Sequence, residues 1–285
     1  MTPRNPPPTG TGSEALGSHR PQSQRVALPQ LTSAEDPSQA DRSGGWVHSH
    51  ETTSTVDGPG FRYTVWLAGC HLRCQYCHNP DTWALQAGNR RTSKQVIDDA
   101  RRFATFLRST KGGFTVSGGE PLVQKSFAIE LIRHAKQDLK LHTALDTNGY
   151  LGDQLLDDEL SEIDLVILDL KAYDTAHHRR VTGFGNEKIL SFARRLARLG
   201  RPAWVRYVLV PGLTDIPEEV EAIGRFVGHM SNVERLEVLP FHQLGRAKWM
   251  QLGQRYALAD TPPASREQAA DAVAQFHAAG CGVAC

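Results

Sequence analysis

The segment AGCHLRCQYCHNPDTW, residues 68–83, carries three of the five cysteines in a chain of 285 residues. Cys70, Cys74 and Cys77 follow directly on an apolar run, YTVWLA over 63–68, which its β-branched and aromatic residues predict to be a strand. The thiols therefore lie on the loop that leaves the end of a buried strand. In α/β folds this is the edge of the sheet where sites are built.

Three thiols on one short loop suit an iron–sulfur cluster, whereas tetrahedral structural zinc needs a fourth ligand, for which His71 or His78 is available. We favour the cluster, with zinc and a set of buried structural thiols as the alternatives. A cluster held by three protein ligands leaves one iron open to a small molecule. An open iron indicates a catalyst rather than a passive electron carrier.

On either side of the loop the sequence alternates between strand and helix patterns. Short β-branched or aromatic runs predict six strands, over 63–68, 114–117, 141–145, 165–168, 204–210 and 236–239. Helical periodicity predicts helices from the Thr92-Ser93 cap as far as Leu107 and near 124–136, 153–161, 187–199, 217–229 and 265–279. Such alternation predicts parallel strands with right-handed crossovers, in a doubly wound sheet or a barrel.

Glycine and polar residues follow the predicted strands at their carboxyl ends. They are Cys70, Gly118-Gly119-Glu120, Asp146-Thr147-Asn148, Asp169-Leu170-Lys171, Pro211-Gly212 and His242. Six strand ends reach one pocket more easily in a curved sheet than in a flat one. We therefore predict an α/β fold, a partial (β/α)6 TIM-like barrel with its active site at the C-terminal ends of the strands.

Composition excludes several classes of protein. The formal net charge is only +1, so no bulk charge favours nucleic acid or a membrane surface. No apolar run approaches the roughly 18 residues that span a bilayer, and the N-terminus lacks the apolar core of a secretory signal. We expect a cytoplasmic protein, in which clustered cysteines serve as metal or redox groups rather than as disulfides.

Residues 1–44 differ from the rest of the chain. They contain Pro6-Pro7-Pro8, many Ser, Thr, Gly and Gln residues, and no aromatic residue. Such a segment buries too little apolar area to offset its ordering entropy, and its acidic residues argue against the alternative of a transit peptide. We expect a disordered N-terminal extension over 1–44, dispensable for activity, and one core domain over 45–285.

The cysteine spacing, with an aromatic residue before the third cysteine, resembles that of the radical S-adenosylmethionine superfamily. Further motifs extend the likeness over nearly all of the core domain: TVDGPGFR at 55–62, SGGEPL at 117–122, LDTNGY at 145–150, ILDLKAYD at 167–174, RYVLVPGLTD at 206–215 and LPFHQLGRAKW at 239–249. Together they resemble the pyruvate formate-lyase activating enzymes. The ordered set is more specific than the cysteine spacing alone.

The resemblance implies a 4Fe-4S cluster whose open iron is chelated by the amino and carboxylate groups of S-adenosylmethionine. An electron from reduced flavodoxin or ferredoxin cleaves that cofactor to methionine and a 5'-deoxyadenosyl radical. The radical then takes an α-hydrogen from one glycine of the partner, pyruvate formate-lyase, and leaves a stored glycyl radical. The protein itself binds and orients the cofactors and excludes water, while the cofactors supply the radical chemistry. We expect a monomer that docks transiently on this partner.

The resemblance assigns the cluster ligands to the three loop cysteines, Cys70, Cys74 and Cys77. It places Tyr76 and His78 in the wall of the adenosyl pocket. Gly118 and Gly119 are expected beside the methionine amino group, where the missing Cβ allows close approach. Glu120 either hydrogen-bonds to that amino group or holds the turn.

Asp169-Leu170-Lys171 resembles the segment that contacts the cofactor from the fourth strand, where a carboxylate and an ammonium group bracket a zwitterion. His242 resembles a cofactor-contacting histidine. Asp146 and Thr147, with Asp169, resemble a small monovalent-cation site, for which oxygen ligands are suitable. The structural alternatives are a salt-bridged strand end and a core histidine.

The stretch Asp57-Gly58-Pro59-Gly60 is first of all a turn signal. The resemblance places it at the opening where the glycine loop of the partner enters. Asp57 and Arg62 are then the expected partner-binding residues, with Arg62 ordering the turn.

The remaining cysteines narrow the choice of partner. None lies between Cys77 and Ser117, so the chain lacks the two-cluster insert of many other activases, which favours pyruvate formate-lyase. Cys281 and Cys285 are too few for a second cluster and are expected to be free thiols, with a reversible disulfide as the alternative. Competing functions are an activase of another glycyl radical enzyme such as anaerobic ribonucleotide reductase, an electron carrier, and a zinc-stabilised binding module.

Overall fold

The computed structural model describes residues 44–285. The expected extension over 1–44 lies outside this part of the chain except for Gly44, which begins the first strand. The described strands are β1 Gly44–Ser54, β2 Arg62–Leu67, β3 Asn89–Thr92, β4 Gly113–Gly118, β5 His142–Thr147, β6 Leu165–Asp169, β7 Ala203–Leu209 and β8 Val233–Pro240.

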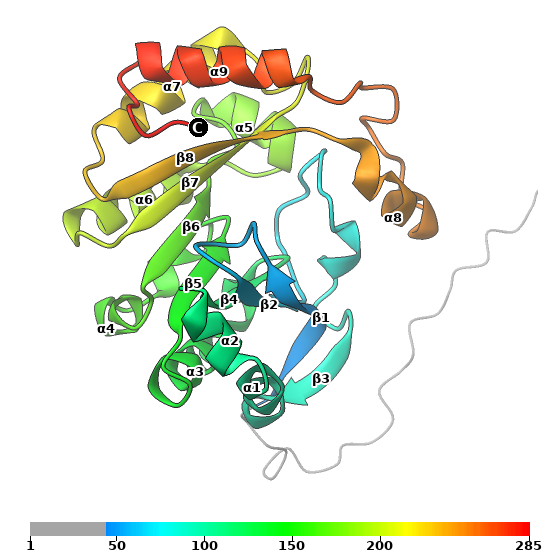
Figure 1. The fold of residues 1–285 in the computed structure, drawn as a ribbon. Coiled ribbons are helices and arrows are strands. Elements are labelled where there is room, and N and C mark those ends of the chain that lie inside the picture. Colours follow the sequence, from blue (N-terminus) through cyan, green and yellow to red (C-terminus); the bar gives the residue numbers. More distant parts are fainter. Residues whose placement is uncertain (1–43) are drawn as a thin grey trace, which may run out of the picture. The chain divides into compact units, whose positions relative to one another are not determined.

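The strands form one sheet in the order β3-β1-β2-β4-β5-β6-β7-β8. The six strands from β2 to β8 pair in parallel, as in the register that joins Val65 to Val116 and Val116 to Leu145. Figure 1 shows the sheet curving through the molecule, with helices along its outer side. The six predicted parallel strands are confirmed, and within the described residues the sheet is open between β3 and β8.

Two strands were missed from the sequence. β1 and β3 pair antiparallel, β1 with β2 and β3 with β1, and extend the sheet beyond its parallel part. Their sequences, GGWVHSHETTS and NRRT, are mostly polar because β3 forms the edge of the sheet and covers only Gly44–Val47 of β1, so both strands are largely exposed. Edge strands of this kind lack the apolar runs by which buried parallel strands are found.

The helices are α1 Ser93–Arg101, α2 Ala104–Ser109, α3 Lys125–Gln137, α4 Asp157–Ser161, α5 Thr175–Thr182, α6 Glu187–Arg198, α7 Pro217–Gly228, α8 Arg246–Gln251 and α9 Arg266–Ala278, with single 3-10 turns η1 Pro80–Thr82, η2 Pro121–Gln124, η3 Gly152–Gln154 and η4 Gln243–Gly245. The predicted cap at Thr92 is confirmed, since its hydroxyl accepts from the backbone N–H of Gln95. The single helix predicted as far as Leu107 is wrong, because the chain breaks into α1 and α2 near Phe103. The short helices α5 and α8 were not predicted.

Three apolar clusters hold the described residues together, and the two largest bear on the site. The larger one fills the space between sheet and helices and includes the fully buried Val65, Phe114 and Val116. The smaller one surrounds the cysteine loop, residues 68–83, and includes Leu72 and Trp249. The cysteine loop is therefore packed into the molecule as a small core of its own.

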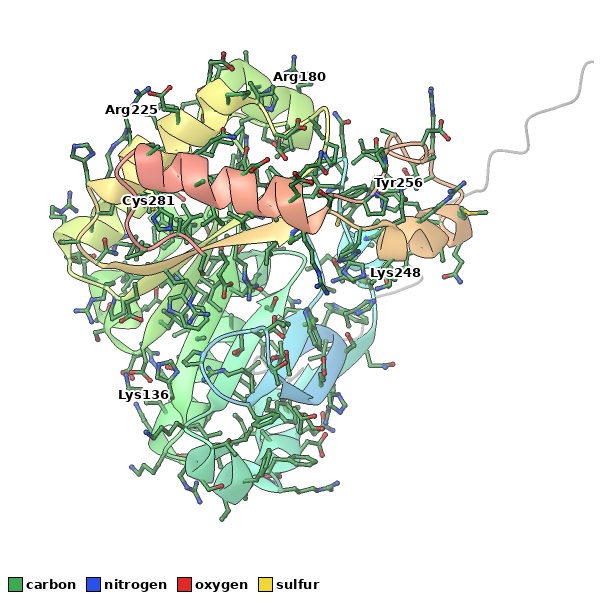
Figure 2. The ribbon with its side chains drawn as sticks, turned by 45° about the horizontal axis from the view of Figure 1, so that its top comes forward. Lys136, Arg180, Arg225, Lys248, Tyr256 and Cys281 are labelled. Carbon is green, nitrogen blue, oxygen red and sulfur yellow. The ribbon has the colours of Figure 1, made fainter. Side chains whose placement is uncertain are left out.

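The C-terminal segment pairs with the outer edge of β8. Leu236 donates its backbone N–H to Val283 O at 2.9 Å and accepts from the N–H of Cys285 at 2.8 Å. Cys281, beside α9 in Figure 2, is buried and Cys285 is exposed; both are free thiols, as expected. Among the described residues, no helix is both long and apolar enough to cross a lipid bilayer.

Candidate active site

A cavity of about 250 Å³ opens at the C-terminal ends of the parallel strands. Most of the predicted site residues line it, namely Cys70, Cys74, Tyr76, Cys77, His78, Gly118, Gly119, Asp169, Lys171 and His242. They come from the cysteine loop after β2 and from the ends of β4, β6 and β8. The fold thus brings together residues as far apart in the sequence as Cys70 and His242, both in the cavity lining.

The cysteine loop is fastened by backbone hydrogen bonds on both sides. Gly69 N donates to Thr82 O at 2.7 Å, which closes the loop on itself. Further along, Arg73 N donates to Thr182 O at 2.8 Å, across to the end of α5. These bonds use main-chain groups, so they do not themselves depend on a particular side chain.

Two side chains that the sequence analysis missed also hold this loop. The guanidinium of Arg73 donates to the carbonyl of Cys70 at 2.7 Å and lies over the ring of Trp83, 4.8 Å from its centre. The indole of Trp249 donates to the carbonyl of Cys77 at 2.9 Å. Trp249 ends the LPFHQLGRAKW motif, so its role was within reach of the sequence. For Arg73 the sequence offered no signal beyond its position between Cys70 and Cys74.

The three thiols face the cavity from apolar surroundings. Burial raises the pKa of Cys74, and it raises the pKa of Cys77 to about 12. Neutral thiols in such surroundings are poor nucleophiles, but they become good ligands when a cationic metal group stabilises the thiolates. No three His, Cys, Asp or Glu side chains in residues 44–285 converge on a point suited to a single metal ion.

The glycine pair after β4 allows the chain to approach itself closely. Gly118 has a φ of +143°, and a Cβ there would lie 2.1 Å from Leu67 O. A Cβ on Gly119 would lie 2.6 Å from Gly69 O and 3.0 Å from the Cβ of Cys70. The missing side chains therefore let the end of β4 pack against the start of the cysteine loop, while both glycines still line the cavity.

Glu120 lies behind the cavity wall and is buried. Its carboxylate accepts from Thr147 Oγ1 at 2.7 Å and from the backbone N–H groups of Leu122 at 3.0 Å and Asn148 at 2.8 Å. Burial raises the pKa of Glu120 to about 7. Of the two roles expected from the sequence, this geometry supports holding the turn. Leu170 likewise packs in the larger core rather than at the cavity.

Asp169 and Lys171 form an ion pair in the cavity wall. Lys171 Nζ lies 3.0 Å from Asp169 Oδ2 and 5.6 Å from the centre of the Tyr76 ring. Burial opposes the charge of Lys171, but Asp169 and Tyr76 raise its pKa well above the usual value. One carboxylate and one ammonium group are thus presented side by side, charged, to whatever enters the cavity.

Two histidines close another part of the wall. The rings of His78 and His242 meet edge to face, with centres 4.9 Å apart. Burial lowers the pKa of His78, and the neighbouring His242 and Lys248 lower it further. His78 is therefore neutral at pH 7 and offers an apolar ring face. Lys248 and Tyr256 come from the α8 region, which flanks this side of the molecule in Figure 2.

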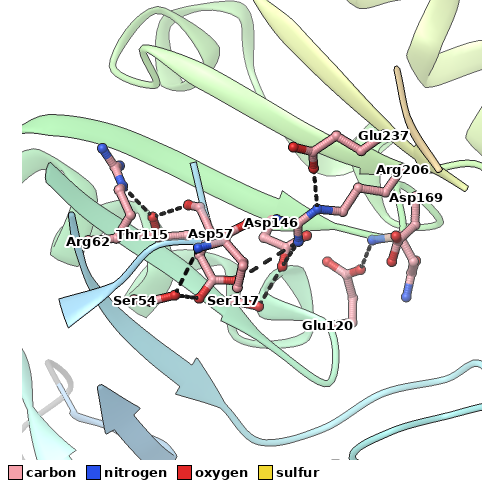
Figure 3. A network of polar contacts seen from close by, with 12 residues as sticks. Ser54, Asp57, Arg62, Thr115, Ser117, Glu120, Asp146, Asp169, Arg206 and Glu237 are labelled. Atoms are coloured by element: carbon pink, nitrogen blue, oxygen red, sulfur yellow. Dashed lines mark hydrogen bonds and ion pairs between the residues drawn. The ribbon is translucent and has the colours of Figure 1, made fainter. Parts of the chain in front are cut away.

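A polar network crosses the inside of the curved sheet (Figure 3). Its centre is Arg206 of β7, whose guanidinium lies 3.2 Å from Asp146 Oδ2, 3.2 Å from Glu237 Oε2 and 3.9 Å from Asp57 Oδ1. It also donates to Val56 O. The structure therefore puts the expected cation ligand Asp146 against a permanent positive charge, outside the cavity lining.

The expected partner-binding residues lie at the other end of this network. Asp57 accepts from Ser54 Oγ at 2.6 Å, and its carbonyl accepts from Thr115 Oγ1 at 2.7 Å. Arg62 has no exposed area and donates to Thr115 Oγ1 at 2.9 Å and Pro59 O at 3.4 Å. Arg62 therefore orders the turn from within and offers no surface of its own to a partner.

Comparison with known proteins shows which families the chain is similar to. The Radical SAM superfamily profile matches residues 64–227. Pyruvate formate-lyase-activating enzyme of Streptococcus mutans is 42% identical over 82% of this chain and 91% of its own length. Pyruvate formate-lyase 1-activating enzyme of Escherichia coli K12 is 39% identical over 78% of this chain and 91% of its own length.

Solved structures support the fold. Spore photoproduct lyase, in a mutant with AdoMet bound, aligns with a TM-score of 0.58 and 13% identity over 83% of this chain and 78% of its own. A radical SAM methyltransferase from Sphaerobacter thermophilus aligns with a TM-score of 0.56 and 17% identity over 81% and 70%. The predicted partial barrel is confirmed, since radical SAM enzymes have this architecture. The chain belongs to the radical SAM superfamily and, within it, to the pyruvate formate-lyase-activating enzymes.

Proposed function

We propose that this protein activates pyruvate formate-lyase by generating a glycyl radical on it, using S-adenosylmethionine and a 4Fe-4S cluster held by Cys70, Cys74 and Cys77. The observation that carries the proposal is the convergence of these thiols with the Asp169–Lys171 ion pair on one cavity. Family membership favours this reading over a zinc-stabilised module or a passive electron carrier.

A cluster held by Cys70, Cys74 and Cys77 would supply the electron for reductive cleavage of S-adenosylmethionine, which would yield methionine and, after hydrogen transfer from the glycine, 5'-deoxyadenosine. The side chains bind and orient. Lys171 suits the methionine carboxylate and Asp169 suits its ammonium group, because the two side chains present opposite charges side by side in the cavity wall. Tyr76, His78 and His242 suit the adenosyl part, because their rings form an apolar wall that excludes water.

A monovalent cation near Asp146, Thr147 and Asp169 is part of the proposal. Burial raises the pKa of Asp146 to about 6, although Arg206 opposes this shift. The charged form of the carboxylate is therefore less stable than it would be in water. A cation would stabilise the charged form. We also propose a monomer in the cytoplasm that receives its electron from reduced flavodoxin or ferredoxin.

The turn over 55–61 is the proposed border of the opening for the glycine loop of the partner. Val56 is exposed on this turn, and the Asp57 carboxylate holds the turn by accepting from Ser54 Oγ and lying 3.9 Å from Arg206 of β7. Asp57→Ala should reduce radical formation on the partner more than it reduces cleavage of S-adenosylmethionine without partner. Equal losses in the two assays would contradict this role.

The test of the function is anaerobic. The reconstituted, reduced protein is mixed with S-adenosylmethionine and pyruvate formate-lyase, and an electron paramagnetic resonance spectrum is recorded. We expect a glycyl radical doublet with the wild-type protein and with Cys285→Ala, whose thiol is exposed and outside the cavity lining, but none with Cys74→Ala.

Other outcomes reassign the protein. 5'-Deoxyadenosine without a doublet would keep the radical chemistry and direct the search to another glycyl radical enzyme, such as anaerobic ribonucleotide reductase. Bound iron and sulfide without cleavage of S-adenosylmethionine would leave an electron carrier. Zinc in place of iron and sulfide would leave a structural module.

A further inference from the structure

We infer that the side-chain amide of Asn148 sets the reduction potential of the cluster, by donating a hydrogen bond to the sulfur of Cys70. Asn148 Nδ2 lies 3.7 Å from Cys70 Sγ, within the range of an N–H···S hydrogen bond. The inference rests on the proposed cluster at the three cysteines. Asn148, which lies outside the cysteine motif, would thus position the Cys70 sulfur and adjust the reduction potential of the cluster.

The orientation of the amide is decided by its other contacts. Asn148 Oδ1 accepts the backbone N–H of Tyr150 at 2.9 Å, so a flipped amide would set two donors against each other. The NH2 group is therefore the half that faces Cys70. The backbone of Asn148 is held as well, since its N–H donates to Glu120 Oε2 at 2.8 Å.

Neighbouring residues keep this arrangement rigid. Glu120 also accepts from the hydroxyl of Thr147, which in turn accepts from the N–H of Gly149 at 3.0 Å. Asn148 is buried and lines the cavity beside Cys70. A hydrogen bond in such a water-poor place is electrostatically stronger than one at the surface.

The direction of the effect follows from charge. Adding an electron to a cluster makes its thiolate ligands more negative, so a donor at one of them stabilises the reduced state more than the oxidised state. Hydrogen bonds to the sulfurs are among the factors that set cluster potentials, and such outer partners also orient the ligands. Asn148 should therefore raise the potential and make the cluster easier to reduce.

The test is an anaerobic redox titration of the reconstituted protein, followed by electron paramagnetic resonance, without the partner enzyme. Asn148→Leu keeps the size but removes the donor. We expect the equilibrium constant for cluster reduction to fall about threefold to tenfold, where tenfold is 59 mV for a one-electron couple. Asn148→Asp keeps the acceptor for Tyr150 and places a carboxylate oxygen at the sulfur, so its potential should be lower still.

Asn79→Asp is the matched control. Asn79 also lines the cavity, but its Oδ1 accepts from Lys248 Nζ at 2.7 Å, a contact that aspartate retains. This variant adds the same charge without touching the bond to Cys70. A shift clearly smaller than that of Asn148→Asp supports the inference.

The inference and the proposed function fail differently. If the wild-type protein takes up no cluster, the proposed function falls first. If the cluster forms and the potential of Asn148→Leu equals that of the wild type, the inference is overturned while the function stands. If Asn148→Leu does not fold, Asn148→Asp is the deciding variant. A cluster potential in Asn148→Asp that equals the wild-type value, or a shift no larger than that of Asn79→Asp, also overturns the inference.

Discussion

The cysteine loop and the network around Arg206 lie in the same curved sheet, yet they are held together in different ways. The loop is fastened by main-chain bonds and by ring contacts such as that of Arg73 with Trp83. The network joins side chains from β5, β7, β8 and the turn before β2. The loop can be recognised in the sequence because its residues are neighbours in the chain. The residues of the network are far apart in the chain and come together only on folding.

The two regions also differ in charge. The loop buries neutral thiols, which costs little. The network gathers the carboxylates of Asp57, Asp146 and Glu237 around one guanidinium (Figure 3). Burial opposes the charge of Arg206, but these neighbours raise its pKa above the usual value. The folding stability of the protein should therefore change little with side-chain substitutions in the loop that keep its backbone hydrogen bonds, but should fall when the network loses its cation.

The largest expected effect belongs to the loop. Cys77→Ala removes one of the three proposed ligands and should lower metal affinity more than about 100-fold, beyond the range typical of outer partners of a metal site. Iron and sulfide content after reconstitution measures this. Cys281→Ser is the control, because that thiol lies beside α9, away from the cavity lining. Full cluster content in Cys77→Ala would refute the assignment.

The next effect tests the network. Arg206→Leu leaves the buried Asp57 and the partly buried Asp146 without their cation and should lower the free energy of unfolding by about 3–5 kcal/mol. Urea unfolding of the protein measures it. Arg235→Ala is matched, since Arg235 also pairs with Glu237, at 3.2 Å, but is half exposed. That loss should stay near or below about 1 kcal/mol. Equal losses would show that the network does not depend on Arg206.

A smaller effect comes from Glu120, which supports the loop from behind. Its pKa of about 7 in the folded protein exceeds the value of 4.5 for the free group, so the folded state holds the proton longer. The unfolded state binds fewer protons between these values, and stability should therefore fall as pH rises through this window, by about 3 kcal/mol at most.

Glu120→Gln removes this titration. Urea unfolding at pH 5 and pH 8 should show a smaller difference between the two pH values for the variant than for the wild type. An identical pH dependence in both proteins would show that Glu120 is already ionised at pH 5.

The smallest expected effect concerns Arg73, whose guanidinium holds the cysteine loop. Arg73→Ala removes the donor to the carbonyls of Cys70 and Leu72, but the side chain is exposed, so the loss of stability should be about 1 kcal/mol. Thermal unfolding measures it. The control is Arg179→Ala, whose exposed pair with Glu187 should contribute less than about 0.5 kcal/mol. A loss in Arg73→Ala no larger than in the control would show that the backbone bonds suffice.

Local patterns predicted much of the fold and of the cavity lining. The six parallel strands were visible because strands buried on both faces need apolar runs, as in LVIL over 165–168. The polar strands β1 and β3, at and next to the edge of the sheet, left no such pattern. The glycine pair was expected beside the cofactor, and both residues do line the cavity, but the space left by the missing Cβ atoms is taken by the backbone at Leu67 and Gly69, which no local pattern indicates.

The amino-acid order alone determined the strand–helix alternation, the three thiols on one loop and the family, because each depends on residues that are neighbours in the chain. Tertiary structure alone decided that Arg206 is shared by Asp57, Asp146 and Glu237, that Arg62 is buried, and that the amide of Asn148 points at Cys70. Distances between side chains far apart in sequence depend on sheet curvature and register. These are set by the packing of the whole domain.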